Sequence, residues 1–173
     1  MYRKYPEIKC LPWSVIQIDG RVSDPSTLYG KDIVITSLLK GVNVSLFNDV
    51  LQYKDTTINP VIHEAMTVFH ENIKNKIPKK ARFCGVCTSD MQFYLFSVWH
   101  IRRCISWDET SIIAETLKLN IVPELYNGPW NNVIFDSLLK VRFKDMIHGY
   151  AVRNSGEFTL CEFHKNVMHY IAS

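Results

Sequence analysis

The sequence has no apolar run long enough to span a bilayer, and its opening M-Y-R-K-Y-P lacks the hydrophobic segment of a secretory signal. Neither sign of charge dominates, because the formal net charge is only +3 over 173 residues, so total charge does not indicate an anionic partner. The five cysteines are an odd number, which favours reduced thiols over a disulfide framework. These absences predict a cytoplasmic protein with no membrane partner.

A hydrophobic content of 47% and a charged content of 21% are those of an ordinary globular chain. At this length the chain can bury a core without disulfides or metals. We therefore expect a single domain over residues 1–173. Its first part, residues 1–30, should be an extended lead-in, because proline and glycine recur too often there for long elements.

Four residues have the spacing C-x2-C-x12-H-x3-C, which is similar to a zinc finger: Cys84, Cys87, His100 and Cys104. The segment between them argues against zinc. Residues 92–99 form a dense run of aromatic and β-branched side chains, which predicts a strand and leaves no helix to carry the histidine. We predict buried thiols on two core strands and no metal site, with zinc as the alternative.

Strands are predicted where Val, Ile and aromatic residues concentrate, at residues 31–37, 42–47, 81–87 and 92–99. A helix is predicted over residues 60–76, because Asn59 is a good cap, Pro60 suits the first helical position and apolar residues follow at helical spacing. A capping box at Ser106 predicts a second helix through Leu119.

The lysines and the arginine of residues 74–82 follow the first predicted helix. They are interpreted as a solvated helix end and loop. Contact with nucleic acid through this basic segment is the alternative.

Two short stretches carry residues typical of a chemical site. Residues 36–43 read T-S-L-L-K-G-V-N, and residues 148–153 read H-G-Y-A-V-R. The first resembles the motif T-E-K-x-D-G-E-N of RNA ligases and related covalent nucleotidyltransferases, with Thr36, Gly41 and Asn43 retained. The second resembles the family's E-G-x-V-x-R, with Gly149, Tyr150, Val152 and Arg153 matching.

The most extensive similarity to the RNA ligases covers residues 93–96, 104–110 and 122–128. The resemblance implies that Phe96 is the aromatic residue that stacks on adenine; a core phenylalanine is the alternative. Across the whole chain the resemblance implies an α+β ligase-type nucleotidyltransferase (adenylation-domain) fold. Such a fold has mainly antiparallel sheets flanked by helices, and no separate carboxyl-terminal domain is expected here.

The sequence departs from the family pattern where the chemistry lies. The family's nucleophilic lysine falls on Leu38, which has no lone pair to attack the α-phosphate of ATP. Motif acids fall on Ser37, Lys40, Val42, Val86 and His148. The family's late lysine falls on His169, and the arginine of its H-A-R-S segment falls on Lys54. The resemblance therefore implies loss of the Mg²⁺ site and a neutral or positive cavity.

From these departures we expect a catalytically inactive protein, with no metal and no cofactor, that binds a nucleotide or cyclic nucleotide without turnover. The binding residues are predicted to be Lys40, Lys54, Phe96, His148, Arg153 and His169, which could meet phosphate directly. One such role is a phage protein that sequesters a nucleotide signal of host immunity in the host cytoplasm.

Three alternatives stay open at this point. The protein could be a nucleic-acid-binding decoy or partner of a true RNA ligase, with RNA as its ligand. It could be an atypical ligase that uses Lys40 as nucleophile, since two residues along a strand keep Lys40 on the face of Leu38. The old cavity could also have collapsed, filled with apolar side chains.

Overall fold

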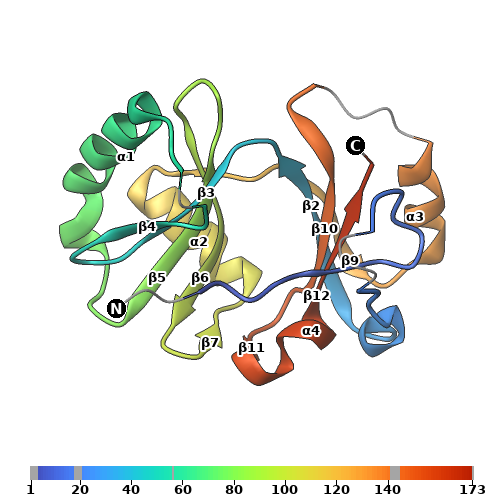
Figure 1. Ribbon diagram of the computed structural model, residues 1–173. Coiled ribbons are helices and arrows are strands. Elements are labelled where there is room, and N and C mark those ends of the chain that lie inside the picture. Colours follow the sequence, from blue (N-terminus) through green and yellow to red (C-terminus); the bar gives the residue numbers. More distant parts are fainter. Residues whose placement is uncertain (1–3, 18–20, 56, 141–144, 173) are drawn as a thin grey trace. The chain divides into compact units, whose positions relative to one another are not determined.

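The computed structural model describes residues 4–17, 21–55, 57–140 and 145–172 (Figure 1). The chain forms two compact units. Unit 1 combines Met1–Tyr5 with Lys40–Val122, and unit 2 combines Pro6–Leu39 with Pro123–Ser173. Each unit is built from two separate segments of the sequence, and the single domain expected from the sequence stays a prediction.

Unit 1 is built on an antiparallel sheet in the order β7-β6-β5-β3-β4, with β8 added in parallel to β6. Its strands are β3 (Val42–Leu46), β4 (Leu51–Tyr53), β5 (Ala81–Cys87), β6 (Phe93–His100), β7 (Arg103–Cys104) and β8 (Asn120–Ile121). One face of this sheet packs against α1 (Pro60–Ile73) and α2 (Trp107–Leu117), whose Met66 and Ala114 are buried with Val44, Phe83 and Leu95. Figure 1 shows both helices beside this sheet.

The helix boundaries of unit 1 follow the predicted capping residues. The Asn59 side chain accepts a hydrogen bond from the Val61 N–H at 2.8 Å, and α1 ends in a short 3-10 turn, η2 (Lys74–Lys76). Ser106 accepts from the Glu109 N–H at 3.2 Å. The second helix ends two residues earlier than expected, because Lys118 takes a left-handed conformation at φ 57° that closes the helix.

Unit 2 holds a sheet in the order β1-β12-β10-β2-β9, antiparallel except for the β1–β12 pair. Its strands are β1 (Lys9–Cys10), β2 (Asp32–Leu39), β9 (Glu124–Pro129), β10 (Ile147–Asn154) and β12 (Val167–Ile171). Shorter elements complete the unit: η1 (Pro25–Leu28), α3 (Asn132–Leu139), β11 (Phe158–Thr159), η3 (Leu160–Glu162) and α4 (Phe163–Asn166). The mixture of antiparallel sheets and helices confirms the predicted α+β class.

The core of unit 2 is aromatic. Tyr150 is fully buried and stacks on Tyr170, with ring centroids 4.7 Å apart, and the Trp13 indole N–H donates to its hydroxyl at 2.8 Å. Leu11 and Leu28 are also fully buried in this core. The described residues of the predicted lead-in, 4–17 and 21–30, therefore contribute β1, η1 and core side chains.

The cysteines are free thiols, of which only Cys161 is exposed. Cys84 and Cys87 are three residues apart on β5, so their side chains lie on opposite faces of the sheet. Cys87 packs in the helix-covered core, whereas the Cys84 Sγ lies 3.7 Å from the Ser45 Oγ on the other face. This geometry argues against the zinc-finger alternative, and the described residues contain no cluster of three or more His, Cys, Asp or Glu suited to a metal ion.

Within the described residues, no helix has both the length and the apolar character needed to cross a membrane.

Candidate functional site

The face of the unit 1 sheet opposite its helices carries the motif residues of that unit. Asn43 pairs with Val86, which pairs with Tyr94, so these three side chains form one row across β3, β5 and β6. The next row on this face is Ser45, Cys84 and Ser97. We call this surface motif face 1. It holds the retained Asn43 and also Val86, which occupies the position of a family glutamate.

Phe96 lies on motif face 1 two residues after Tyr94, and a bulge in β6 puts the next residue, Ser97, on the same face. The register shifts there from Ser97 opposite Cys84 to Leu95 opposite Gly85, which leaves Phe96 as the extra residue. A bulge re-aims a side chain, and Phe96 and its neighbour Ser97 both meet Tyr5. The ring centroids of Phe96 and Tyr5 are 5.9 Å apart, and the Tyr5 hydroxyl lies 3.4 Å from the Ser97 Oγ. Phe96 is therefore half-buried on this face and not packed under the helices.

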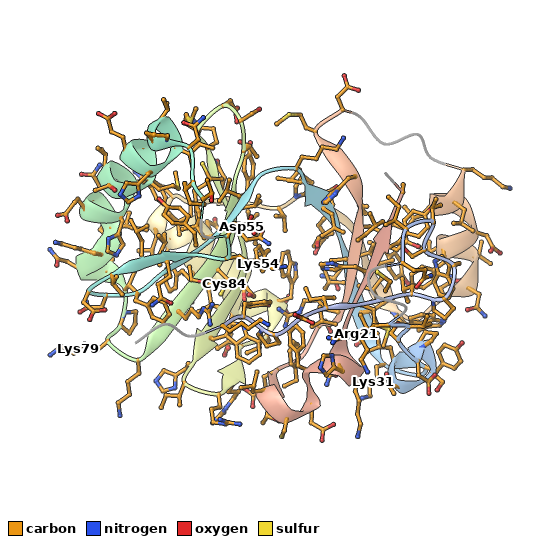
Figure 2. The ribbon with its side chains drawn as sticks, in the orientation of Figure 1. Arg21, Lys31, Lys54, Asp55, Lys79 and Cys84 are labelled. Carbon is orange, nitrogen blue, oxygen red and sulfur yellow. The ribbon has the colours of Figure 1, made fainter. Side chains whose placement is uncertain are left out.

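Two predicted lysines lie next in the chain to strands of unit 1, Lys54 after β4 and Lys40 two residues before β3. Lys54 is exposed at the end of β4, and its backbone N–H donates to the Asn43 carbonyl at 3.1 Å. Figure 2 shows Lys54 over the sheet that also carries Cys84. Lys40 is exposed as well, but β2 ends at Leu39. The expectation that Lys40 shares a strand face with Leu38 is therefore wrong, because the alternation of side chains does not extend beyond the strand.

Gly41 follows Lys40 at a position where the chain backbone passes another strand closely. A Cβ atom there would lie 2.2 Å from the Cys87 carbonyl oxygen, which is too close for any side chain. The retained glycine is thus required by the approach of the backbone to β5.

Unit 2 has a corresponding surface on the sheet face opposite its aromatic core. Thr36, Ala151 and His169 form one row across β2, β10 and β12, and Leu38 lies opposite Gly149. Arg153 projects from the same face of β10 because it alternates with the core residue Val152. We call this surface motif face 2. It carries Leu38, Arg153 and His169.

The side chain of Arg153 is buried and tied to the turn after β10. Its Nε donates to the Asn154 carbonyl at 2.8 Å, and one Nη donates to the Gly156 carbonyl at 3.2 Å. The guanidinium carbon also lies 5.1 Å from the centre of the Phe158 ring. These contacts fix the position of the charge before any ligand binds.

The two histidines of unit 2 are half-buried. His148 lies where the β10–β2 register shifts between Ile147 and Gly149, and its carbonyl accepts from the Ala172 N–H at 2.8 Å. His169 lies in regular β12 pairing, opposite Ala151. The substitution of a motif acid by His148 therefore coincides with an irregularity in the strand.

Sequence analysis assigned Arg82 to an exposed basic segment, and the structure corrects this. Arg82 is half-buried on motif face 1, where its Nε donates to the Ser45 Oγ at 2.9 Å. Its guanidinium carbon lies 5.4 Å from the Tyr5 ring centre and 5.5 Å from that of Phe47. The sequence indicated this location of Arg82 in one way: along the predicted strand, Arg82 alternates with Cys84 and Val86 and therefore shares their face.

The rest of the basic segment lies apart from motif face 1. The Lys74 Nζ is 2.9 Å from the Glu71 carboxylate, and Figure 2 shows Lys79 at the outer end of unit 1, away from Lys54 and Cys84.

Burial keeps Tyr5 and Cys84 of motif face 1 neutral. It raises the pKa of Tyr5 well above its ordinary value, and the nearby Cys84 and Cys104 act in the same direction. Burial also raises the pKa of the Cys84 thiol, although Arg82 opposes this shift. Neither group is therefore a nucleophile at neutral pH.

A divalent metal ion of the kind that ligases use does not fit the motif positions described here. Ca²⁺ and Mg²⁺ need several oxygen ligands, but the acids expected from the motifs are replaced by Ser37, Val42, Val86 and His148. The valine side chains on these strands offer only hydrocarbon.

The family model described as RNA ligase matches residues 37–168, which is most of the chain. The protein therefore belongs to the RNA ligase family. No curated protein matches the sequence.

Solved structures confirm the ligase-type nucleotidyltransferase fold. A mutant of the Naegleria gruberi RNA ligase with ATP and Mn has a TM-score of 0.63 at 14% identity, covering 85% of this chain and 51% of that one. Another mutant of that ligase, with AMP and Mn, has a TM-score of 0.65 at 14% identity, covering 99% of this chain and 56% of that one. An archaeal ATP-dependent RNA ligase has a TM-score of 0.69 at 11% identity, covering 99% of this chain and 48% of that one. The chain thus spans about half the length of these ligases.

These findings overturn one expectation. Sequence analysis predicted that the protein is not an enzyme, but its family and fold are those of ATP-dependent RNA ligases, which are enzymes. The prediction was wrong because it extended one missing amine, at Leu38, to the whole activity. A leucine at that position excludes that side chain alone as nucleophile.

Proposed function

We propose that motif face 1 binds a nucleotide, with the base against Phe96 and the phosphates contacted by Lys40 and Lys54. The observation that carries this proposal is the half-buried aromatic ring of Phe96 on the face that bears the family residue Asn43. Aromatic rings bind bases by stacking, and exposed lysines are common phosphate ligands. The Naegleria relatives were solved with ATP or AMP, which supports a nucleotide as ligand.

For motif face 2 we propose phosphate binding by Arg153, with His148 and His169 as further contacts. The turn carbonyls of Asn154 and Gly156 hold the guanidinium in place, so little side-chain entropy is lost when an anion binds. A histidine adds a positive charge to such a contact only when its ring is protonated, and an unperturbed histidine titrates near pH ~6.5. The contribution of the two histidines should therefore decrease as the pH rises.

Calorimetry with ATP, AMP, a cyclic dinucleotide and a short RNA, with and without EDTA, tests both proposals. We expect nucleotide binding that EDTA does not change, because the motif positions replace acids by neutral or basic residues. Phe96→Ala should weaken ATP binding, and His169→Gln should remove part of its pH dependence. Tyr29→Ala, which removes an exposed aromatic ring of unit 2, is the control.

The outcomes separate the possible roles. Tight reversible binding of the cyclic dinucleotide would favour sequestration of a nucleotide signal, whereas preference for the RNA would favour a role beside an RNA ligase. Binding that requires Mg²⁺, or an unchanged affinity in Phe96→Ala, would contradict the proposal for motif face 1.

A second candidate is covalent adenylation at Lys40. It is favoured by an exposed amine two residues after Leu38, beside the retained Gly41, in a family of ATP-dependent ligases. In this step the neutral Lys40 Nζ would form a bond to the α-phosphorus of ATP, the bond from that phosphorus to the bridging oxygen would break, and pyrophosphate would leave. The proton lost from the nitrogen would pass to solvent.

Intact-mass measurement after incubation with ATP and a divalent cation tests this candidate. An added adenylyl mass that Lys40→Arg abolishes and the matched Lys54→Arg preserves would support it. A chain that gains no mass would remove Lys40 as nucleophile and leave reversible binding.

A further inference from the structure

Tyr5, near the start of the chain, packs on motif face 1 beside Phe96. Its ring is nearly perpendicular to those of Phe96 and Trp99, with centroid distances of 5.9 Å and 6.2 Å. The hydroxyl lies 3.4 Å from the Ser97 Oγ, and the Arg82 guanidinium lies 5.4 Å from the ring centre. Tyr5 thus contacts Arg82 on β5 and three residues on β6.

The strand register shows which part of the face Tyr5 covers. Tyr5 contacts Ser97, which lies in the row of Ser45 and Cys84. It also contacts Arg82 and Trp99, which pair in the next row toward the amino end of β5. The row of Asn43, Val86 and Tyr94 lies on the other side of the Ser45 row, along the same face. Phe96, as the bulge residue, lies at the boundary between the two parts.

We propose that Tyr5 is a positioning residue for nucleobase binding: it closes one end of motif face 1 and fixes the orientation of the Phe96 ring. This inference rests on the proposed nucleotide binding by that face.

The physical basis is preorganisation. Edge-to-face contact favours one orientation of an aromatic ring, and Phe96, as the bulge residue, has no residue opposite it on β5 to pack against. A base that stacks on a ring already held in place orders fewer side chains on binding. The hydroxyl anchors Tyr5 through Ser97 and stays neutral because burial raises its pKa, so this anchor does not vary with pH near neutrality.

The test uses two ligands that share phosphates but not a base: ATP and inorganic triphosphate. We expect Tyr5→Ala to weaken ATP binding roughly 2- to 12-fold, the range of an aromatic edge contact, and to leave triphosphate binding unchanged. Tyr5→Phe keeps the ring and should bind ATP nearly as the parent does. Tyr5→Leu fills much of the same volume without an aromatic edge, and it serves if the alanine variant does not fold.

A double-mutant cycle separates positioning from a general structural role. In a Phe96→Ala background, Tyr5→Ala should cause no further loss of ATP affinity, because the ring that it positions is absent. Equal losses for ATP and triphosphate, or an undiminished effect of Tyr5→Ala in that background, would overturn the inference.

Ring signals of labelled phenylalanine, assigned to Phe96 by its alanine variant, give a measurement that needs no ligand. They should shift in Tyr5→Ala and stay near their parent positions in Tyr5→Phe. If the parent binds no nucleotide, the proposed function fails. Suppose instead that the parent protein binds nucleotide, but Tyr5→Ala and Tyr5→Leu bind ATP as tightly as the parent, or the Phe96 signals do not move in Tyr5→Ala. In that case only the role of Tyr5 fails.

Discussion

The two motif faces hold their arginines in different ways. On motif face 1, Arg82 bonds to a side chain, the Ser45 hydroxyl, and lies over the rings of Tyr5 and Phe47. On motif face 2, Arg153 bonds to two backbone carbonyls of a turn and lies over the Phe158 ring. One arginine joins strands of a sheet to the start of the chain, and the other stabilises a turn.

This difference shows that a basic residue in a motif, or near one, can have a structural role whether or not it binds a ligand. Arg82 was assigned to solvent and Arg153 to phosphate, yet both are packed against aromatic rings and hydrogen-bonded within their own unit. A test of ligand binding with either arginine must therefore be accompanied by a measurement of stability.

The largest expected effects come from two buried aromatic residues, one in each unit. Trp107 of unit 1 and Tyr150 of unit 2 are almost completely buried, so Trp107→Ala and Tyr150→Ala should each lower the free energy of unfolding by about 3–5 kcal/mol. Tyr126→Ala should cost less, because that side chain is only half-buried. Chemical denaturation measures all three, and parent-like stability of both buried-site variants would contradict the assigned cores.

Next in size are the two arginines. Hydrogen bonds to charged groups contribute about 1.5–3 kcal/mol. Arg153 is buried and bonds to two backbone carbonyls of a turn, whereas Arg82 is half-buried and bonds to the Ser45 hydroxyl. Arg153→Ala should therefore destabilise the protein more than Arg82→Ala in urea denaturation. Lysine at either position keeps the charge but loses the forked geometry, so it should rescue stability only in part. Equal stability of all four variants and the parent would remove the structural role of both arginines.

Much of the fold could be predicted from the sequence, because local signals and packing agree. The Asn59 and Ser106 caps, and the strands rich in β-branched and aromatic residues, lie where predicted within a few residues. The division into discontinuous units could not be read from periodicity, since it depends on long-range pairing such as that of β2 with β10 and β9.

The candidate site was predictable where a motif fixed the backbone and less so elsewhere. Gly41 and Gly149 were matched from the motifs, and both lie where another backbone leaves no room for a side chain. The bulge that places Ser97 beside Phe96 on one face has no sequence signal. The contact of Tyr5 with Phe96 joins residues far apart in the chain. Neither can be found from spacing alone.

Alkaline pH should distinguish the buried tyrosines of the two units. Burial raises the pKa of Tyr150 to about 12 and that of Tyr5 further, whereas a tyrosine in the unfolded chain titrates near ~10. Above that pH the unfolded chain loses protons that the folded protein keeps, so stability should fall with rising pH through this window. Tyr150→Phe and Tyr5→Phe should each make the fall less steep. Urea titrations at several pH values above ~9 measure the slopes, and slopes that match the parent would show that these hydroxyls titrate normally.

The smallest expected effect concerns His164 on α4 of unit 2. Desolvation lowers its pKa, and the nearby Lys9 and Arg21 act in the same direction against the weaker, opposite effect of Glu7. Below pH ~6.5 an unfolded chain takes up a proton on this ring more readily than the folded protein does. The contribution of His164 to the stability of the folded state is therefore fully present above that pH and is lost as the pH falls. His164→Gln should reduce the loss of stability between neutral and mildly acidic pH, by a small amount because the ring is exposed. The exposed His100 of unit 1 provides the matched control, His100→Gln. If both variants follow the acid dependence of the parent, the positive charges around His164 do not act on its titration.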